Sequence, residues 1–426
     1  MSSSRSATDW REVAARVALL LVLSVLPQVP AAAAGPDIDY RHSLLIMWRE
    51  IVAPQLDHQH QCQIDPALPD WSFASLMGSV GGSPDDASTA KFIRDWLALF
   101  DQRQTLPNGL YAVERPQVAA QIAKPWADDW NYDPAHAPFR LLAIVNRMDL
   151  RVSPLLIGEN AGEIHFVFGA IDVTKGKDCA PLPMTVILEF GVRVPSPDAL
   201  KQMAGDWIDL SGYDPGGQMY RDKLARLLHR TIAPNVRPGA KPNGSAIDHI
   251  RTNEALGGQN WEMREFQLAA GTGADLVEAN MTLTPTSSLI GTPQLALFLA
   301  SIGHDIALQD YWVPLYFPGA STALLGSVAL PRGLANSPPV SGPHPSDFSF
   351  NTCTGCHGGD ATTNTGKFTH IDPTLPWYET YSRASSFLHD QVTDARCLQL
   401  LALSGRKGTD GCTTQPGARV RRPLVH

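Results

Sequence analysis

The residues with the clearest chemical meaning form one short motif near the C-terminus, Cys353-Thr354-Gly355-Cys356-His357. Two thiols separated by two residues can add across the two vinyl groups of one haem, because both sulfurs reach their vinyl carbons from a single turn of chain. The adjoining imidazole then lies under the iron as its proximal ligand. The motif therefore predicts one covalently bound c-type haem, held by Cys353, Cys356 and His357.

Two other interpretations of the motif remain open. A disulfide between Cys353 and Cys356 is the first, but the Gly- and Thr-rich sequence that follows does not begin a helix, as the redox pair of a thioredoxin-like fold would require. A zinc site of both thiols with His357 and His370 is the second, and an oxidising compartment disfavours the reduced thiols that it needs. Haem attachment is the favoured interpretation.

The opposite side of the iron needs a ligand from elsewhere in the chain. No methionine follows the motif, because the last one is Met281, so a Met/His haem cannot form within the C-terminal segment. The histidines after the motif are His370, His389 and the C-terminal His426. We expect His370 to be the distal ligand, with His389 as the weaker candidate, because His370 follows a Gly-, Thr- and Asn-rich stretch that can fold back over the ring.

The N-terminus has the features of a removable export signal. Arginines at positions 5, 11 and 16 precede an apolar run at residues 17–26, and a run of alanines ends at Ala34. The apolar run is about half the ~20 residues that span a bilayer, so the pattern favours cleavage near Ala34 over a membrane anchor. We expect a periplasmic or secreted mature protein without a membrane span.

The four cysteines outside the motif are expected to form disulfides, because an oxidising compartment tends to pair an even number of thiols. Cys397 and Cys412 are favoured as one pair, since the loop between them is short and rich in turn-forming residues. Cys62 and Cys179 then form the other pair by elimination. Other connectivities stay open at this point.

The composition excludes several function classes. The chain has 426 residues, of which 44% are hydrophobic and 18% charged, as in an ordinary globular protein. A net charge of -8 without long runs of one sign argues against a nucleic-acid partner. The usual motifs of hydrolases, NTPases, dinucleotide-binding proteins and zinc proteases are absent from the sequence. His165 lies within an apolar run, where a hydrogen-bonded core histidine is the expected role.

The periodicity of apolar residues predicts an α+β fold with a mixed helix and antiparallel-sheet body. Helices are predicted from their apolar residues at 44–52, 92–100, 220–232 and 294–306, and a further helix is predicted to start after residues 195–198. Strands are predicted where short β-branched or aromatic runs are bounded by turn residues, at residues 140–145, 164–168, 184–190, 261–268 and 276–283. The helix at 294–306 is apolar nearly all round, which predicts that it is buried.

The predicted organisation has four parts. Residues 1–34 are the signal peptide, and residues 35–333 form the α+β body. Residues 334–349 form a linker, because their Pro-, Gly- and Ser-rich sequence can neither continue a helix nor pair as a central strand. Residues 350–426 form a small, loop-rich, haem-binding segment.

Several segments resemble one group of proteins. Residues 351–359 and 368–371, together with 139–147, 183–189 and 251–254, are similar to large exported bacterial proteins that carry a lone CxxCH near the C-terminus. The resemblance implies export and a single covalent haem, and it implies no particular reaction. The likeness to cytochromes c is confined to the CxxCH itself.

These observations favour a monohaem protein that passes single electrons to a redox partner of unknown identity, with the α+β body as the docking platform. One alternative is a secreted binding or structural protein whose CxxCH is a disulfide or a metal site. Another is an enzyme or gas binder with five-coordinate haem iron, which has an open distal side. The visible spectrum of the purified protein separates the three.

Overall fold

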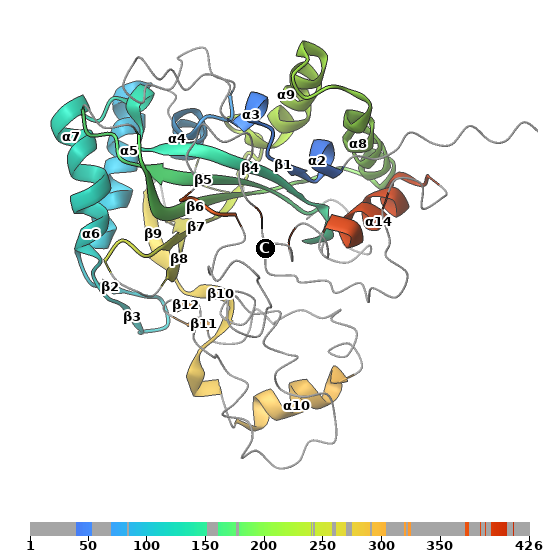
Figure 1. Ribbon diagram of the computed structural model, residues 1–426. Coiled ribbons are helices and arrows are strands. Elements are labelled where there is room, and N and C mark those ends of the chain that lie inside the picture. Colours follow the sequence, from blue (N-terminus) through green and yellow to red (C-terminus); the bar gives the residue numbers. More distant parts are fainter. Residues whose placement is uncertain are drawn as a thin grey trace, which may run out of the picture.

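The computed structural model contains an antiparallel β-sheet with helices on one of its faces (Figure 1). The α+β fold class predicted from the sequence is confirmed. The structure describes residues 40–52, 70–82, 85–150, 161–175, 179–239, 241, 243–257, 261–269, 275–289, 292–303, 319–320, 323–324, 371–374, 384, 388, 393–406 and 412.

The main sheet has eight strands within this described part of the chain. Its order is β1-β4-β5-β6-β7-β8-β12, and β9 also pairs with β8; all neighbours are antiparallel. The strands are β1 (Leu45–Ile46), β4 (Phe139–Arg147), β5 (Glu163–Ile171), β6 (Pro181–Gly191), β7 (Ile247–Glu254), β8 (Glu262–Leu268), β9 (Leu276–Ala279) and β12 (Ala323–Leu324). Two small ribbons pair β2 (Gln104–Thr105) with β3 (Tyr111–Ala112), and β10 (Met281–Pro285) with β11 (Gly319–Ala320).

The helices begin at side-chain caps in several places. Ser72, Asp85, Ser196 and Thr292 each accept a hydrogen bond from a backbone N–H in the first turn of the helix that follows, which satisfies a donor that the helix itself leaves unpaired. The α-helices are α2 (Tyr40–Ser43), α3 (Arg49–Val52), α4 (Phe73–Gly81), α5 (Asp86–Ala98), α6 (Pro116–Val118), α7 (Lys124–Trp130), α8 (Pro197–Asp209), α9 (Gln218–Ile232), α10 (Pro293–Ser301) and α14 (Thr393–Ser404). A π-helical turn, Ala119–Ala123, joins α6 to α7.

The helix-covered face of the sheet carries the main hydrophobic core. Ile164, Phe166 and Phe168 of β5 belong to this core and alternate with residues on the other face, as the pleat of a strand requires. Phe168 packs edge-on against Phe73 of α4, with ring centroids 5.2 Å apart. Full burial of a side chain of this size stabilises a fold by about 1.5–3 kcal/mol. Packing of this kind fixes the helices on β4, β5 and β6.

The opposite face of the sheet carries a smaller hydrophobic cluster. Val145 of β4 and Val167 of β5 pack there with Ile371 and Leu388, which come from the C-terminal part of the chain. Ile371 also forms an antiparallel bridge with Ala384. These described residues after the CxxCH motif are therefore attached to the sheet face that lies away from the main core.

Helix α14 is packed into the body. It lies against α8, and its Leu400 and Leu401 belong to the main core. Its Arg396 is buried, with Nε 3.3 Å from the carboxylate of Asp149 at the end of β4. The described part of the C-terminal region thus shares the core of the body.

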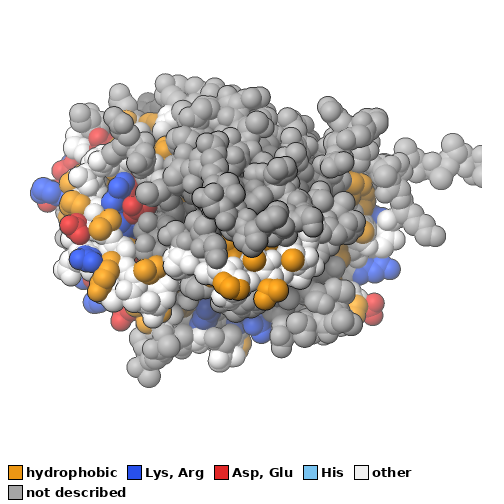
Figure 2. All heavy atoms as spheres, turned by 90° about the horizontal axis from the view of Figure 1, so that it is seen from below, with side chains coloured by type: hydrophobic (Ala, Val, Ile, Leu, Met, Phe, Trp, Pro, Cys, Tyr) orange, Lys and Arg blue, Asp and Glu red, His pale blue; other side chains and the backbone are white. Residues whose placement is uncertain are grey.

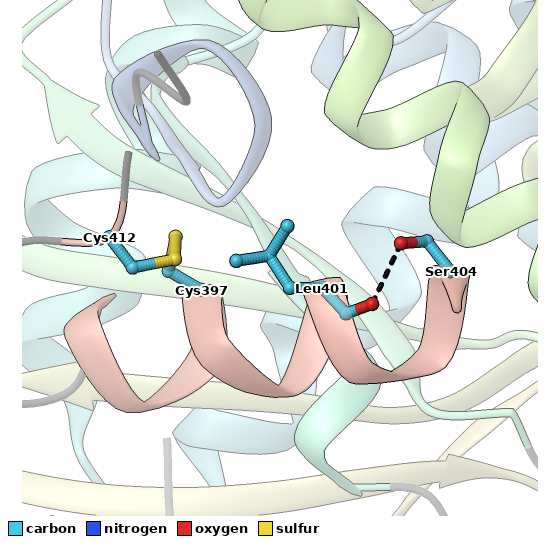
Figure 3. Close-up of a disulfide and its surroundings, with 4 residues drawn as sticks. All are labelled: Cys397, Leu401, Ser404 and Cys412. Carbon is cyan, nitrogen blue, oxygen red and sulfur yellow. Dashed lines mark hydrogen bonds between the residues drawn. A yellow bond between two sulfur atoms is a disulfide. The ribbon is translucent and has the colours of Figure 1, made fainter. Parts of the chain in front are cut away.

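A disulfide fixes the chain after α14. Cys397 in the first half of the helix is bonded to Cys412, with the two Cα atoms 5.7 Å apart (Figure 3). This is the pair that the short, turn-rich loop between them predicts. At the other end of the helix the Ser404 hydroxyl donates a hydrogen bond to the carbonyl of Leu401, 2.8 Å away.

Several segments differ from the sequence prediction, which also missed helices α4, α7 and α14. The helix predicted at residues 44–52 is interrupted, because Leu45–Ile46 instead pair with the edge of β4. The strand β7 was not predicted. Helix α10 exists, but the prediction that it is buried is wrong: Leu295 is buried, whereas Leu297 is 72% exposed. At residues 45–46, pairing with β4 overrides the local helical pattern. Helix α10 is exposed because no element among the described residues covers it.

None of the helices in the described part of the chain is both long and apolar enough to cross a membrane. The face seen in Figure 2 shows the hydrophobic side chains of the described residues in small separate groups, with no broad area of one charge among them. The predicted signal peptide and the predicted linker lie outside the described residues.

Candidate functional site

The residues of the predicted haem site are outside the part of the chain that the structure describes. They are Cys353, Cys356 and His357, together with the distal candidates His370 and His389. Cys62 also falls outside it. Cys179 is described and is disulfide-bonded, and its partner is not among the described cysteines.

A different set of reactive side chains lies within the sheet, on the face opposite the main core. His165 on β5 stands directly across from Glu189 on β6, which stands across from His249 on β7. Glu163 precedes His165 by two residues, so it lies on the same face. These residues form the first part of a row of ionisable groups that runs across the adjacent strands β5, β6 and β7.

The row continues one step along the strands. Arg251 follows His249 by two residues on β7 and pairs in register with Glu265 on β8. We call the six residues together the polar cluster: Glu163, His165, Glu189, His249, Arg251 and Glu265. Their side chains come from four adjacent strands, β5 to β8, so the register of the sheet alone brings them together.

A glycine makes the start of this row possible. Gly162, just before Glu163, has a φ of +107°. A Cβ at this position would lie 2.5 Å from the backbone oxygen of Arg147 at the end of β4. Only glycine therefore lets β5 begin against the end of β4, and this places Glu163 in register with Arg147.

Hydrogen bonds within the polar cluster are short and directional. The Nε2 atom of His165 lies 2.7 Å from Oε2 of Glu163. Arg251 donates from Nη1 to Oε1 of Glu189 at 2.9 Å and from Nη2 to Oε2 of Glu265 at 3.2 Å. The Glu265 carboxylate also accepts from the backbone N–H and the hydroxyl of Thr282. The cluster is thus positioned from both sides.

His249 bridges two carboxylates at longer range. Its Nδ1 atom is 3.7 Å from Oε2 of Glu189, and its Nε2 atom is 3.5 Å from Oε1 of Glu265. The first contact is longer than a hydrogen bond. The oxygen Oε2 of Glu189 therefore keeps lone pairs that Arg251 and His249 do not engage.

Burial controls the protonation of the polar cluster. Burial lowers the pKa of His165 to about 4, against the opposing effect of Glu163, so the ring is uncharged at neutral pH. Burial raises the pKa of Glu189, and the nearby carboxylates of Glu163 and Glu265 add to the rise while Arg251 opposes it. Burial alone would raise the pKa of Glu163, but the hydrogen bond and charge of His165 outweigh it and lower that pKa.

Arg147 borders the polar cluster and is completely buried. Its Nε and Nη2 atoms donate to the carboxylate of Asp149, which also faces Arg396 of α14. The remaining donor, Nη1, is buried and has no hydrogen-bond partner. The charge of Arg147 reaches both His165 and Glu189, where it lowers the pKa of each. A buried donor without an acceptor is costly, and this one lies beside the cluster.

The composition of the polar cluster is that of a metal-ligand set. One atom each from Glu163, His165 and Glu189 lie within 4.8 Å of one another. Imidazole and carboxylate are ligands of Zn²⁺ and of related divalent ions. The hydrogen-bonded core position predicted for His165 is confirmed, whereas its partners were not predicted. The signal was a charged residue inside an otherwise apolar strand, as at Glu189 between Leu188 and Phe190.

A second buried ionic network lies at the far end of β7, β8 and β9, on the opposite face from the polar cluster. Arg264 contacts Glu262 at 2.6 Å and Glu278 at 3.4 Å, and Arg115 pairs with Glu254. Burial raises the pKa of Glu278 to about 7. All of its charged groups pair with one another, so this network joins the strand ends and the loop before α6.

No protein-family model, curated protein or solved structure matches this chain. The functional argument therefore rests on the motif and on the geometry of the described residues.

Proposed function

We propose that this is an exported monohaem c-type protein that transfers single electrons through a haem bound covalently at Cys353 and Cys356. The observation that carries the proposal is the intact CxxCH motif behind an N-terminal export signal, because covalent haem attachment follows export. A bound haem would supply a one-electron iron couple. His357 would hold the iron from the proximal side, and His370 is the proposed distal ligand.

The chemistry of the donor set fits haem. Attachment needs two thiols that are not consumed by other bonds. Cys397 and Cys412 are bonded to each other and do not compete for Cys353 and Cys356. The partner of Cys179 must then be Cys62, a requirement that peptide mapping can test.

The body is the proposed platform for the haem segment. Ile371 lies 14 residues after His357 and packs against Val145 and Val167 on the sheet. Leu388 packs in the same cluster. Residues close in sequence to the proposed haem site thus pack on the body, which supports the body as the surface on which a redox partner docks.

The test is production of the mature protein in a host with haem-attachment machinery. The protein should be red, and its haem should survive acid-acetone extraction and a denaturing gel. The double variant Cys353→Ala/Cys356→Ala should lose the haem, while the matched control Cys397→Ala/Cys412→Ala should keep it. A colourless wild-type protein would refute the proposal and leave a disulfide or metal site at the motif.

The distal ligand decides between electron transfer and ligand chemistry. With His370 bound, the iron is low-spin and closed to carbon monoxide, and His370→Ala should make it high-spin and able to bind the gas. His389→Ala is the control and should leave the spectrum unchanged. A wild type that is already high-spin and binds carbon monoxide would favour a gas-binding or enzymatic role instead. An unchanged low-spin spectrum in His370→Ala would exclude His370 as the ligand.

A further inference from the structure

We propose that Glu163, His165 and Glu189 form a binding site for one divalent transition-metal ion, separate from the CxxCH motif, with Zn²⁺ as the best-fitting ion. One ligand atom from each residue lies within 4.8 Å of the other two. Ligand atoms around a tetrahedral Zn²⁺ are about 3.5 Å apart. The observed limit of 4.8 Å is within about 1.5 Å of that spacing.

The charge balance of the polar cluster points to a cation. Arg251 pairs with Glu189 and with Glu265, whereas Glu163 contacts the imidazole of His165. Among the described residues, the carboxylate of Glu163 therefore contacts no guanidinium. Unpaired buried charge is costly, and a divalent ion removes that cost.

The lone pairs of Glu189 are placed for such an ion. Arg251 uses Oε1 of Glu189, and the nearest imidazole nitrogen to Oε2 is 3.7 Å away on His249. His165 is uncharged at neutral pH and so has a nitrogen lone pair to offer. Glu163 is close enough to His165 to bind the same ion or to orient the ring, as carboxylates commonly do beside metal-bound histidines.

The buried donor of Arg147 is an independent sign of a missing ligand. Its Nη1 atom has no acceptor, and Arg147 stands in register with Glu163. A water molecule or small anion bound to the ion would supply an oxygen acceptor there. The ion would thus neutralise the carboxylates. The water molecule or anion that is its fourth ligand would accept a hydrogen bond from the guanidinium of Arg147.

Zinc binding by the full-length mature protein tests the site. After dialysis against EDTA, calorimetric titration with ZnCl₂ should show one tight site that Mg²⁺ does not compete for. Glu163→Gln and Glu189→Gln, which keep the side-chain shape, should each weaken binding by about 100-fold or more, since even loss of a residue that only supports a ligand costs 10–100-fold. Glu278→Gln, in the separate ionic network, is the matched control and should bind as the wild type does.

The outcomes separate this site from other zinc ligands and from the haem. Zinc binding that is equal in wild type and Glu189→Gln, or absent from the wild type, overturns the proposal. If the glutamine variants fail to fold by circular dichroism, X-ray absorption at the zinc edge of the wild type decides: a nitrogen and oxygen shell with one imidazole supports the site, and a sulfur shell overturns it. Colourless protein that binds zinc refutes the haem proposal alone.

Discussion

The carboxyl group of Glu278 makes the stability of the fold depend on pH. Burial raises its pKa to about 7 from an ordinary value of 4.5, with Glu262 adding to the rise and Arg264 opposing it. Its Oε1 atom is buried without a hydrogen-bond partner, so the protonated form suits the folded state. A carboxyl group whose folded pKa is raised contributes stability below pH 4.5, and this contribution is lost as pH rises through 7.

We therefore expect the free energy of unfolding of the wild type to fall, relative to Glu278→Gln, by up to about 3 kcal/mol between pH 4.5 and 8. Glutamine carries no titrating proton, so the variant lacks this loss. Urea denaturation followed by circular dichroism at a series of pH values measures the difference. Glu114→Gln, at an exposed position, controls for removal of a negative charge. Parallel curves for wild type and Glu278→Gln would contradict the expectation.

At the scale of the elements, the attachment of helix α14 to the body depends on one carboxylate, that of Asp149. Asp149 lies between Arg147 of β4 and Arg396 of α14, and all three side chains are buried. Asp149→Asn would remove the carboxylate charge that both guanidinium groups contact. Breaking a buried ion pair by removal of one partner costs about 3–5 kcal/mol.

Asp149→Asn should therefore lower the free energy of unfolding by about 3–5 kcal/mol and speed hydrogen exchange in α14 before that of β5. The control is Asp95→Asn, whose ion pair with Lys91 is exposed and is worth about 1 kcal/mol or less. Denaturation and exchange mass spectrometry measure the two effects. Equal losses in both variants would show that Asp149 does not hold α14.

Across the whole molecule, the disulfides determine which cysteines remain available to bind the haem. Cys179 is bonded to a cysteine outside the described residues, and the haem proposal leaves only Cys62 for it. Mass spectrometry of the non-reduced mature protein should find peptides linked through Cys62–Cys179 and Cys397–Cys412, with no free thiol. A peptide that links Cys179 to Cys353 or Cys356 would exclude two-thioether attachment.

Much of the fold could be predicted from local patterns. The strands β4, β5 and β6 are buried on both faces, so their apolar runs are nearly continuous and stand out in the sequence. Strand β7 escaped prediction because its apolar residues are Ile247 and Ile250 alone, and the burial of His249 and Arg251 depends on partners in other strands. The exposed face of α10 could not be foreseen either, since apolar composition does not say whether a covering element exists.

The polar cluster could be predicted only in part. A histidine in an apolar run indicated a satisfied core position for His165. Its contact with Glu163 is local, because residues two apart share a face of a strand. Its relation to Glu189 and His249 depends on the pairing register of β5, β6 and β7, and a shift of one residue would send those side chains to the other face. The register of these strands is set only when the sheet assembles, so the site could not be identified from the sequence alone.

The packing of Ile371 and Leu388 on the sheet has a consequence for the order in which the parts of the fold form. The strands that carry the polar cluster lie between residues 163 and 268, and the residues that pack beside it come more than a hundred positions later. Because a chain is synthesised from its N-terminus, Ile371 and Leu388 can cover this sheet face only after the strands have been made. The metal ion proposed for the polar cluster would have its easiest access during that interval.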